Sequence, residues 1–475
     1  MNHHEPDFFE HLRTELRGGR MWLDRAIVLA YAVAAGLSVV ALTMAVDWIF
    51  TGFQRVFAWQ PWLPLVTMPL ITVGVVWATR RFFPAAGGSG IPQVKAALSP
   101  ALPPERRSMF VSLRLAVGKM VLTTAGFAAG LSIGREGPSV QIAAGVMQHA
   151  RRWLSPNTTI DSRALLMAGG AAGIAAAFNA PLAGVLFAIE ELSGRIESRA
   201  SGLIITAIVL AGLVAVSAFG NTSYFGVLKV PPFGWEALLP GLLVALLCGA
   251  AGGLFGRLFI ASLTGAPGRF NAWRARYPYR FAAGCGLAIA VIGLATGGVT
   301  FGAGSEAVKD MLKGHDRLPA IDTLLKFVAT WLSAWSGAPG GIFAPSLSIG
   351  AGIGEVVAQI ANANLGPALI AIGMAAFLAA VTQAPLTSFI IVMEMVDGHA
   401  MVLSLMAGAM LASLVSRMIS RPLYDTLAEH MVAAAIGSPS PVSAEPSASP
   451  EHGPDATPPR TDTLSPPEPE SAPPR

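Results

Sequence analysis

Residues 178–191 read FNAPLAGVLFAIEE, and residues 382–395 read TQAPLTSFIIVMEM. Aligned at an offset of 204 residues, the Ala-Pro-Leu triplets coincide, and Glu190 meets an identical residue. Each segment is an apolar run cut by proline, which is typical of short, interrupted helices, and the chain holds two copies of this pattern.

Two further pairs of segments support an internal duplication. PSVQIAAGV (138–146) matches PSLSIGAGI (345–353), and GSGIPQVKAAL (88–98) matches GAGSEAVKDML (302–312). The three blocks occur in the same order in both halves. Chance matching between Ala- and Gly-rich segments is the alternative explanation, and the common order disfavours it. We therefore predict a tandem duplication inside one unit.

The duplication and the composition of the two ends divide the chain into five parts. About a third of the prolines, 12 of 35, follow residue 436, and so Pro-rich a segment cannot bury a core. The expected parts are a polar cytoplasmic segment with a short amphipathic helix (1–25), a first membrane repeat (26–200), a connecting segment (201–234), a second membrane repeat (235–430) and a Pro/Ser-rich disordered cytoplasmic tail (431–475).

The composition indicates an integral membrane protein with many spans. Of 475 residues, 53% are hydrophobic and 13% are charged, and the mean hydropathy is +0.57. Soluble domains carry about 25% charged residues, so a soluble enzyme is excluded. Without the last 39 residues the chain has 30 basic and 22 acidic side chains, which suits contact with anionic lipid headgroups. No basic-aromatic pattern points to nucleic acid.

The charges around the first apolar runs predict the orientation. Arginines precede the run 26–50, and five basic residues follow the run 62–79. Because cytoplasmic loops are enriched in Lys and Arg, we expect a multi-pass protein of the cell inner membrane with both termini in the cytoplasm. Later apolar segments are cut by Gly and Pro. Broken helices at membrane depth line protein-enclosed pathways, which favours a transporter or channel over an anchor.

Polar residues that occur in only one half are the better candidates for function, because shared residues are explained by packing. Ser89, Glu136 and Glu191 are aligned with alanine, phenylalanine and methionine in the second half. Glu190 is retained in both halves, so we interpret it as structural. No Cys or His grouping has the spacing of a metal site, and no cofactor is expected.

Three Gly- and Pro-containing motifs predict helix starts that face one another around an anion. These are GSGIP (88–92), GREGP (134–138) and GIFAP (341–345). Free N–H groups and the positive end of the helix dipole make a helix N-terminus an anion site. We expect a neutral cradle of dipoles around Ser89. Its supporting backbone residues are Gly88, Gly90, Pro92, Gly134, Gly137, Pro138, Gly341 and Pro345.

A carboxylate among such donors would itself occupy the anion position and would leave it when protonated. This chemistry makes Glu136 a candidate for both gate and proton carrier. Three alternatives stay open at this point. Glu136 could pair with Arg135 at a helix end, Glu191 could be a helix-end residue that reaches toward the surface, and Ser89 could be an ordinary N-cap.

The three motifs, in this order and with AAFNAPLAG between the second and the third, resemble the CLC family of chloride channels and chloride/proton antiporters. The resemblance covers about residues 26–430. It implies an all-helical membrane protein of two inverted-topology repeats of short, partly broken helices. It also implies a homodimer with one pathway in each subunit. No regulatory nucleotide-binding domain is expected in the tail.

The resemblance also implies roles for individual residues. Ser89 looks like the central chloride-coordinating serine, and Ile342 and Phe343 would offer backbone N–H groups to the same ion. Tyr424, in RPLY, resembles the coordinating tyrosine. Glu136 matches the external gating glutamate and Glu191 the internal proton-transfer glutamate of the antiporters.

We therefore expect a secondary active exchanger of chloride and protons, which are its substrates. The alternative is a passive voltage- or pH-gated chloride channel of the same fold, which differs from the exchanger only by a small barrier. A third possibility, an intramembrane enzyme built on Glu190 and Glu191, lacks an accompanying nucleophile or metal-ligand set, so we predict that the protein is not an enzyme.

Overall fold

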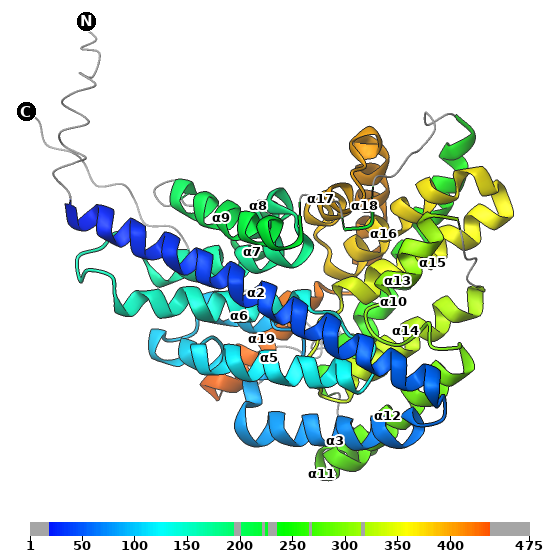
Figure 1. Ribbon diagram of the computed structural model, residues 1–475, viewed down its shortest axis with the longest axis horizontal. Helices are drawn as coiled ribbons and strands as arrows, with labels where there is room; N and C mark the ends of the chain where they lie inside the picture. The colour runs from blue at the N-terminus through cyan, green and yellow to red at the C-terminus, as the bar shows by residue number, and fades with distance from the viewer. Residues whose placement is uncertain are drawn as a thin grey trace, which may run out of the picture.

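The computed structural model describes residues 19–193, 201–220, 224–226, 235–265, 268–314 and 319–437. Within these ranges the chain is a helical bundle, and its strand-like pairing is limited to two isolated β-bridges (Figure 1). The expected N-terminal amphipathic helix and the tail beyond residue 437 lie outside the described residues.

The helices of the first half are α2 (Gly19–Trp59), α3 (Pro64–Phe82), α4 (Ile91–Leu98), α5 (Leu113–Ala128), α6 (Glu136–His149), α7 (Ser162–Phe178), α8 (Pro181–Phe187) and α9 (Ser201–Phe219). Short 3₁₀ turns are η1 (Pro84–Ala86), η2 (Pro104–Met109) and η3 (Ala150–Arg152), and η4 (Ala188–Ser193) is a π-helical turn that continues α8. The motifs GSGIP and GREGP lead into α4 and α6, as the sequence predicts.

The helices of the second half are α10 (Leu238–Thr264), α11 (Arg269–Arg276), α12 (Pro278–Ala295), α13 (Ser305–Leu312), α14 (Ala320–Trp335), α15 (Phe343–Ala361), α16 (Gly366–Thr382), α17 (Pro385–Met395), α18 (Val402–Arg417) and α19 (Leu423–Ile436). Its 3₁₀ turns are η5 (Trp235–Ala237), η6 (Ala363–Leu365) and η7 (His399–Met401). The two Ala-Pro-Leu triplets lead into α8 and α17.

The duplication is visible in three dimensions. α6 packs on α7 as α15 packs on α16, and the equivalent helices α8 and α17 contact each other, as do α3 and α12. Gly134 and Gly341, which are equivalent in the alignment, exchange two hydrogen bonds, each N–H donating to the other's carbonyl over 2.7 Å. Reciprocal contacts between equivalent residues are what a local two-fold axis produces, so the two halves meet around such an axis.

One helix of the expected connecting segment packs within the first half of the bundle. In the expected connecting segment 201–234, α9 packs against α2, α7 and α8 as α18 packs against α10, α16 and α17. α9 therefore has packing partners in the first half that correspond to those of α18 in the second half. The aligned sequence blocks end near Glu190, so they give no sign of the position of α9. A helix that packs through one apolar face needs no motif shared with its counterpart. At the other end, α19 runs to Ile436, six residues into the expected tail.

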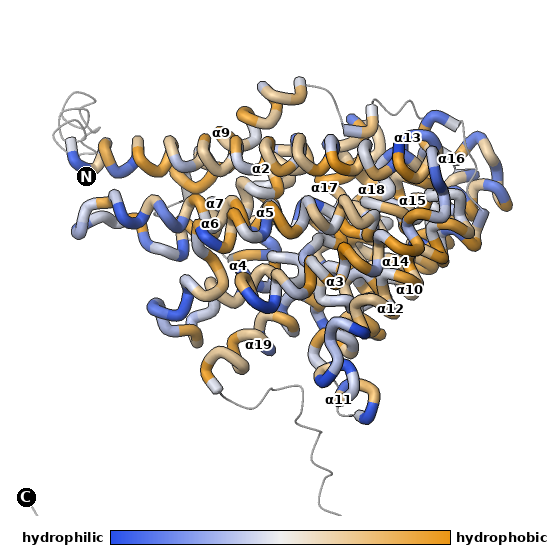
Figure 2. The backbone as a smooth tube through the Cα atoms, turned by 60° about the horizontal axis from the view of Figure 1, so that its bottom comes forward, coloured by the Kyte–Doolittle hydropathy of each residue, from blue (hydrophilic) through white to orange (hydrophobic). Residues whose placement is uncertain are grey.

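Eight helices of the described residues are long and apolar enough to cross a membrane. Hydrophobic residues cover most of the bundle, and hydrophilic ones gather at its edges and on α11 (Figure 2). The inner helices α15 and α16 approach so closely that a Cβ atom at Gly350 would collide with the carbonyl of Gly373. Small residues therefore position these helices, and through them the loop that precedes α15.

Candidate functional site

The three motifs meet at the starts of α4, α6 and α15. The Gly134–Gly341 pair joins the loops before α6 and α15, and Gly340 N–H donates to Gly88 O over 3.1 Å, which ties in the loop before α4. A Cβ atom at Gly137, in the first turn of α6, would collide with Ser89 Oγ. The expected supporting residues Pro92, Pro138 and Pro345 lie within the first turns of these helices and are buried.

Ser89 is not the cap of α4. The N-cap is Gly90, whose φ of 114° strongly favours glycine, and its N–H is capped by Gln93 Oε1 at 2.9 Å. The Ser89 hydroxyl is buried and makes no hydrogen bond among the described residues. The N-cap alternative is therefore wrong. A buried hydroxyl without a partner is costly, which points to a ligand for it.

Tyr424 is a second buried hydroxyl of the same kind. It lies in the first turn of α19, its side chain is 1% exposed, and its OH also lacks a partner within the described residues. Its hydroxyl is a neighbour of Ser89 Oγ. Its ring lies 6.1 Å from the ring of Phe343, the first residue of α15. The two predicted hydroxyl ligands and the start of α15 thus come together.

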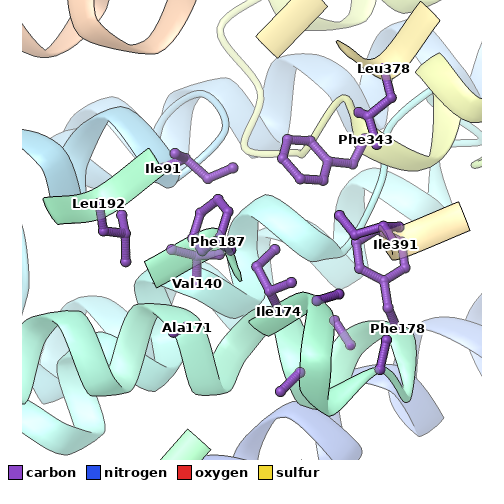
Figure 3. Packing of buried hydrophobic residues seen from close by; sticks show 14 of the residues in the cluster. Ile91, Val140, Ala171, Ile174, Phe178, Phe187, Leu192, Phe343, Leu378 and Ile391 are labelled. Atoms are coloured by element: carbon purple, nitrogen blue, oxygen red, sulfur yellow. The ribbon is translucent and has the colours of Figure 1, made fainter. Parts of the chain in front are cut away.

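An apolar wall surrounds this meeting point. The Phe343 ring lies 6.2 Å from Phe178 and 6.4 Å from Phe187. Figure 3 shows Phe343 in one cluster with Ile91 of α4 and with these two rings. Ile342, the N-cap of α15, is 4% exposed. In these surroundings, the first N–H groups of α15 have no helical partner and little access to water.

Glu136 is the first residue of α6 and is 3% exposed. Its Oε2 accepts a hydrogen bond of 3.4 Å from Ala344 N–H, in the first turn of α15. The carboxyl group therefore occupies the helix N-terminus at which an anion would bind. Arg135 does not pair with it: Arg135 Nη1 lies 2.6 Å from Asp47 Oδ1. The alternative of an Arg135–Glu136 pair is wrong.

A cavity of about 390 Å³ lies against Glu136. Arg135, Asp47 and Tyr224 line it. Arg135 Nη2 donates to the Tyr224 hydroxyl over 3.3 Å, and that hydroxyl donates to Ser305 Oγ over 3.2 Å. Tyr224 comes from the segment between the repeats, where the sequence holds no motif that would have singled it out.

Glu191 lies apart from this cluster. It belongs to the π-helical turn η4 and is buried, so it is not a surface-reaching helix end. Lys95 Nζ lies 2.7 Å from Glu191 Oε1 and 2.5 Å from Asp425 Oδ1. These three side chains line a second cavity of about 720 Å³. The sequence marks Lys95 only as a repeat match and as one of the basic residues that predict the orientation, and it gives no signal for Asp425 beside Tyr424.

Comparison with known proteins identifies the family to which this chain belongs. Residues 70–417 match the family model described as voltage gated chloride channel. The chain belongs to the voltage-gated chloride channel family. The chain is 31% identical to the H(+)/Cl(-) exchange transporter ClcA of Cronobacter sakazakii over 423 residues, which cover 83% of this chain and 87% of that protein. It is 30% identical to the ClcA of Citrobacter koseri over 460 residues, which cover 90% and 95%.

Solved structures of the chloride channel family share the fold. The crystal structure of a slow cyanobacterial Cl⁻/H⁺ antiporter superimposes with a TM-score of 0.71 at 25% identity, over 86% of this chain and 98% of that one. The predicted fold class is therefore confirmed: an all-helical membrane protein of two inverted-topology repeats of short, partly broken helices.

Within this chloride channel fold, Glu190 has the structural role predicted for it. Its carboxylate accepts from Leu386 N–H at 3.0 Å and Thr387 N–H at 2.6 Å, in the first turn of α17. Its counterpart Glu394 accepts from the equivalent N–H groups of α8, at 3.2 and 2.7 Å. Each glutamate caps the other half's helix, so Glu190 and Glu191 do not form a paired site.

The loop that carries Ser89 has a support that the sequence did not single out. Lys119 is fully buried, and its Nζ donates to Ala86 O at 2.7 Å and to Gly88 O at 2.6 Å. The loop that carries Ser89 is thus held by a lysine, whereas the sequence predicted a cradle built from dipoles alone. A lysine within an otherwise apolar helix was the sequence signal that could have pointed to this role.

Proposed function

We propose that this protein exchanges chloride for protons across the membrane as a secondary active transporter. The observation that carries the proposal is the position of Glu136. Its carboxyl group accepts from the first turn of α15, beside the two buried hydroxyls that have no partner among the described residues. The ClcA relatives named as H(+)/Cl(-) exchange transporters support the same reaction.

Chloride binds, in this proposal, between Ser89 Oγ, the Tyr424 hydroxyl and the backbone N–H groups of Ile342 and Phe343. These donors carry partial charges, and the apolar wall of phenylalanine rings excludes competing water. Binding to dipoles alone is weak enough for the ion to leave again, which conduction through a membrane requires.

Glu136 acts as gate and proton carrier. Ionised, its carboxylate holds the start of α15 and excludes chloride from that position, since both compete for the same N–H groups. Protonated, it loses most of this attraction and moves away, and chloride takes its place. The cavity lined by Arg135 and Asp47 connects Glu136 to one side of the membrane.

Glu191 passes protons between Glu136 and the cytoplasm. It lines the cavity on the other side of the site, together with Lys95 and Asp425. Its burial and its separate cavity support a proton route distinct from the chloride path. The passive channel remains the competing function, because it needs the chloride ligands and Glu136 but has no use for Glu191.

We further propose that the protein works as a homodimer in the cell inner membrane, with both termini in the cytoplasm. Arg80 and Arg81 in the last turn of α3, and the arginines of α11, support this orientation, since basic residues are retained on the cytoplasmic side.

The test is proton movement in sealed liposomes under a chloride gradient without an imposed pH gradient. Valinomycin and potassium hold the voltage at a value that cannot drive protons in the observed direction. We expect uphill proton movement with the wild-type chain and chloride movement alone with Glu191→Gln, because the amide cannot carry a proton.

Glu190→Gln is the matched control. It makes the same chemical change one residue away, at a carboxylate that caps α17, so we expect proton coupling to persist. Chloride movement without proton movement by the wild-type chain would establish the channel instead. Coupled transport by Glu191→Gln would remove that residue from the proton route.

A further inference from the structure

A cavity of about 520 Å³ lies outside the candidate transport site, where α3 and α14 end and α12 begins. Its wall includes Arg80 in the last turn of α3, Pro278 at the start of α12 and Trp335 at the end of α14. α11 contributes Asn271 and Arg274 to the same wall. Figures 1 and 2 both show α11 at the edge of the bundle, beside α3 and α12.

The chemistry of this cavity, which we name the α11 pocket, is basic. Residues 269–280 read RFNAWRARYPYR, with four arginines, four aromatic residues and no acid. Arg80 and Arg274 line the pocket, and none of its described lining residues is acidic. Two guanidinium groups therefore share one cavity without a carboxylate in its described wall.

Arg274 is partly buried and is held in place by neighbouring groups. Its guanidinium lies 5.6 Å from the centre of the Phe281 ring and 5.9 Å from that of Trp335, and its Nη1 donates to Ser262 O. Burial lowers the pKa of Arg274, and the nearby positive charge of Arg80 lowers it further. Arginine remains charged in proteins, so the two like charges repel, and an anion between them would relieve that repulsion.

The position of the pocket favours a lipid as the source of the anion. It lies at the level where α3, α12 and α14 end, and the rings of Trp77 on α3 and Tyr279 on α12 are exposed there, as in the aromatic belt of a membrane interface. In the orientation proposed above, on which this step rests, the pocket faces the cytoplasmic leaflet, and basic pockets between helices on that side are suited to anionic headgroups. We propose that the α11 pocket binds the phosphate group of an anionic phospholipid of the cytoplasmic leaflet.

The pocket is connected to the transport site through one loop. Ser336 and Gly337 belong to its wall, and the same loop continues into the GIFAP motif. In that loop the Gly340 N–H donates a hydrogen bond to Gly88 O. A headgroup in the pocket therefore contacts the loop that positions the start of α15.

Native mass spectrometry of the full-length chain in detergent tests the proposal. Phosphatidylglycerol and phosphatidylcholine with the same acyl chains are the probes. We expect tighter binding of phosphatidylglycerol, and a loss of at least about tenfold in its affinity in the double variant Arg80→Gln/Arg274→Gln. Arg269→Gln/Arg276→Gln changes the net charge equally outside the pocket and should retain the wild-type affinity.

Three results would overturn the assignment: equal affinity for the two lipids, equal loss in both double variants, or displacement of phosphatidylglycerol by millimolar inorganic phosphate. The last result would make free phosphate the ligand. Thermal unfolding checks that each variant is folded. If loss of the Arg274 contacts unfolds the protein, Arg80→Gln alone serves, because that side chain is exposed.

Discussion

The two halves of the molecule share one helical frame and differ in the polar groups that they add to it. At three aligned positions the first half carries a serine and two glutamates, Ser89, Glu136 and Glu191, where the second carries alanine, phenylalanine and methionine. The second half instead supplies the start of α15, whose N–H group binds the Glu136 carboxylate. The helices that the two halves share thus fix the geometry of the candidate site, and the polar residues that differ between the halves supply its chemistry.

The shared polar groups illustrate the other side of this comparison. Lys119 and Lys326 are aligned, and each is buried and donates to two carbonyl oxygens of an equivalent loop. Only the loop of the first half carries the serine. These lysines therefore belong to the frame, where they satisfy carbonyl groups that a broken helix leaves without partners.

The largest expected effect comes from Glu136→Gln. A glutamine cannot ionise, so chloride flux should lose its dependence on pH and proton movement should vanish. Flux from proteoliposomes between acidic and alkaline pH measures this. Glu355→Gln, at another buried carboxyl group that accepts from Gln359 in α15, should keep the wild-type pH dependence. Persistent steep pH dependence in Glu136→Gln would count against the gate.

A smaller effect is expected at an aligned pair of lysines with different partners. Lys95 is 12% exposed and bridges Glu191 and Asp425, whereas Lys309 is 31% exposed and pairs with Glu306 at 3.0 Å. Lys95→Met leaves the buried carboxylate of Glu191 without a paired cation, which raises the free energy of its charged form. A carboxylate that ionises less readily exchanges protons less readily. We expect proton transport to fall several-fold relative to chloride flux.

Lys309→Met is the control, because an exposed ion pair contributes little. Both variants are compared by the ratio of proton to chloride flux in the same liposomes. An equal ratio in the two variants would show that the Lys95 bridge has no part in proton transfer.

The smallest effect is expected at the two reciprocal caps. Glu190→Gln and Glu394→Gln each replace a charged acceptor of two helix N–H groups by a neutral one. Each should lower the free energy of unfolding by about 1–2 kcal/mol, and by similar amounts in the two variants. Chemical unfolding in detergent measures this, and coupling should remain intact. A loss of coupling in Glu190→Gln alone would contradict the equivalence of the two caps.

Much of the fold could be read from local signals. Proline and glycine mark where α4, α6, α8, α15 and α17 begin, because these residues act on the backbone of their own turn. The packing of α9 could not be read in this way. That helix packs with an apolar side, which any set of apolar residues can provide, so no motif distinguishes it from a connecting segment.

The site was predictable to the extent that its residues lie in motifs. Ser89, Glu136 and Tyr424 were predicted by their motifs or by the asymmetry of the halves, and they lie where three helix starts meet. Asp47 and Tyr224 were not, although they hold Arg135 beside Glu136. A charged or aromatic side chain at the edge of a membrane helix has many ordinary uses, so residue type alone could not single them out.

By itself, the sequence determined that this is a duplicated membrane protein with broken helices and which polar residues break the symmetry, because composition and local backbone preferences are properties of neighbouring residues. Only the tertiary structure decided the partners: Lys95 with Glu191 across 96 residues and Glu136 with the start of α15 across 208. Such pairs form because helices from both halves pack around one axis. Their separation along the chain leaves no local pattern from which they could be read.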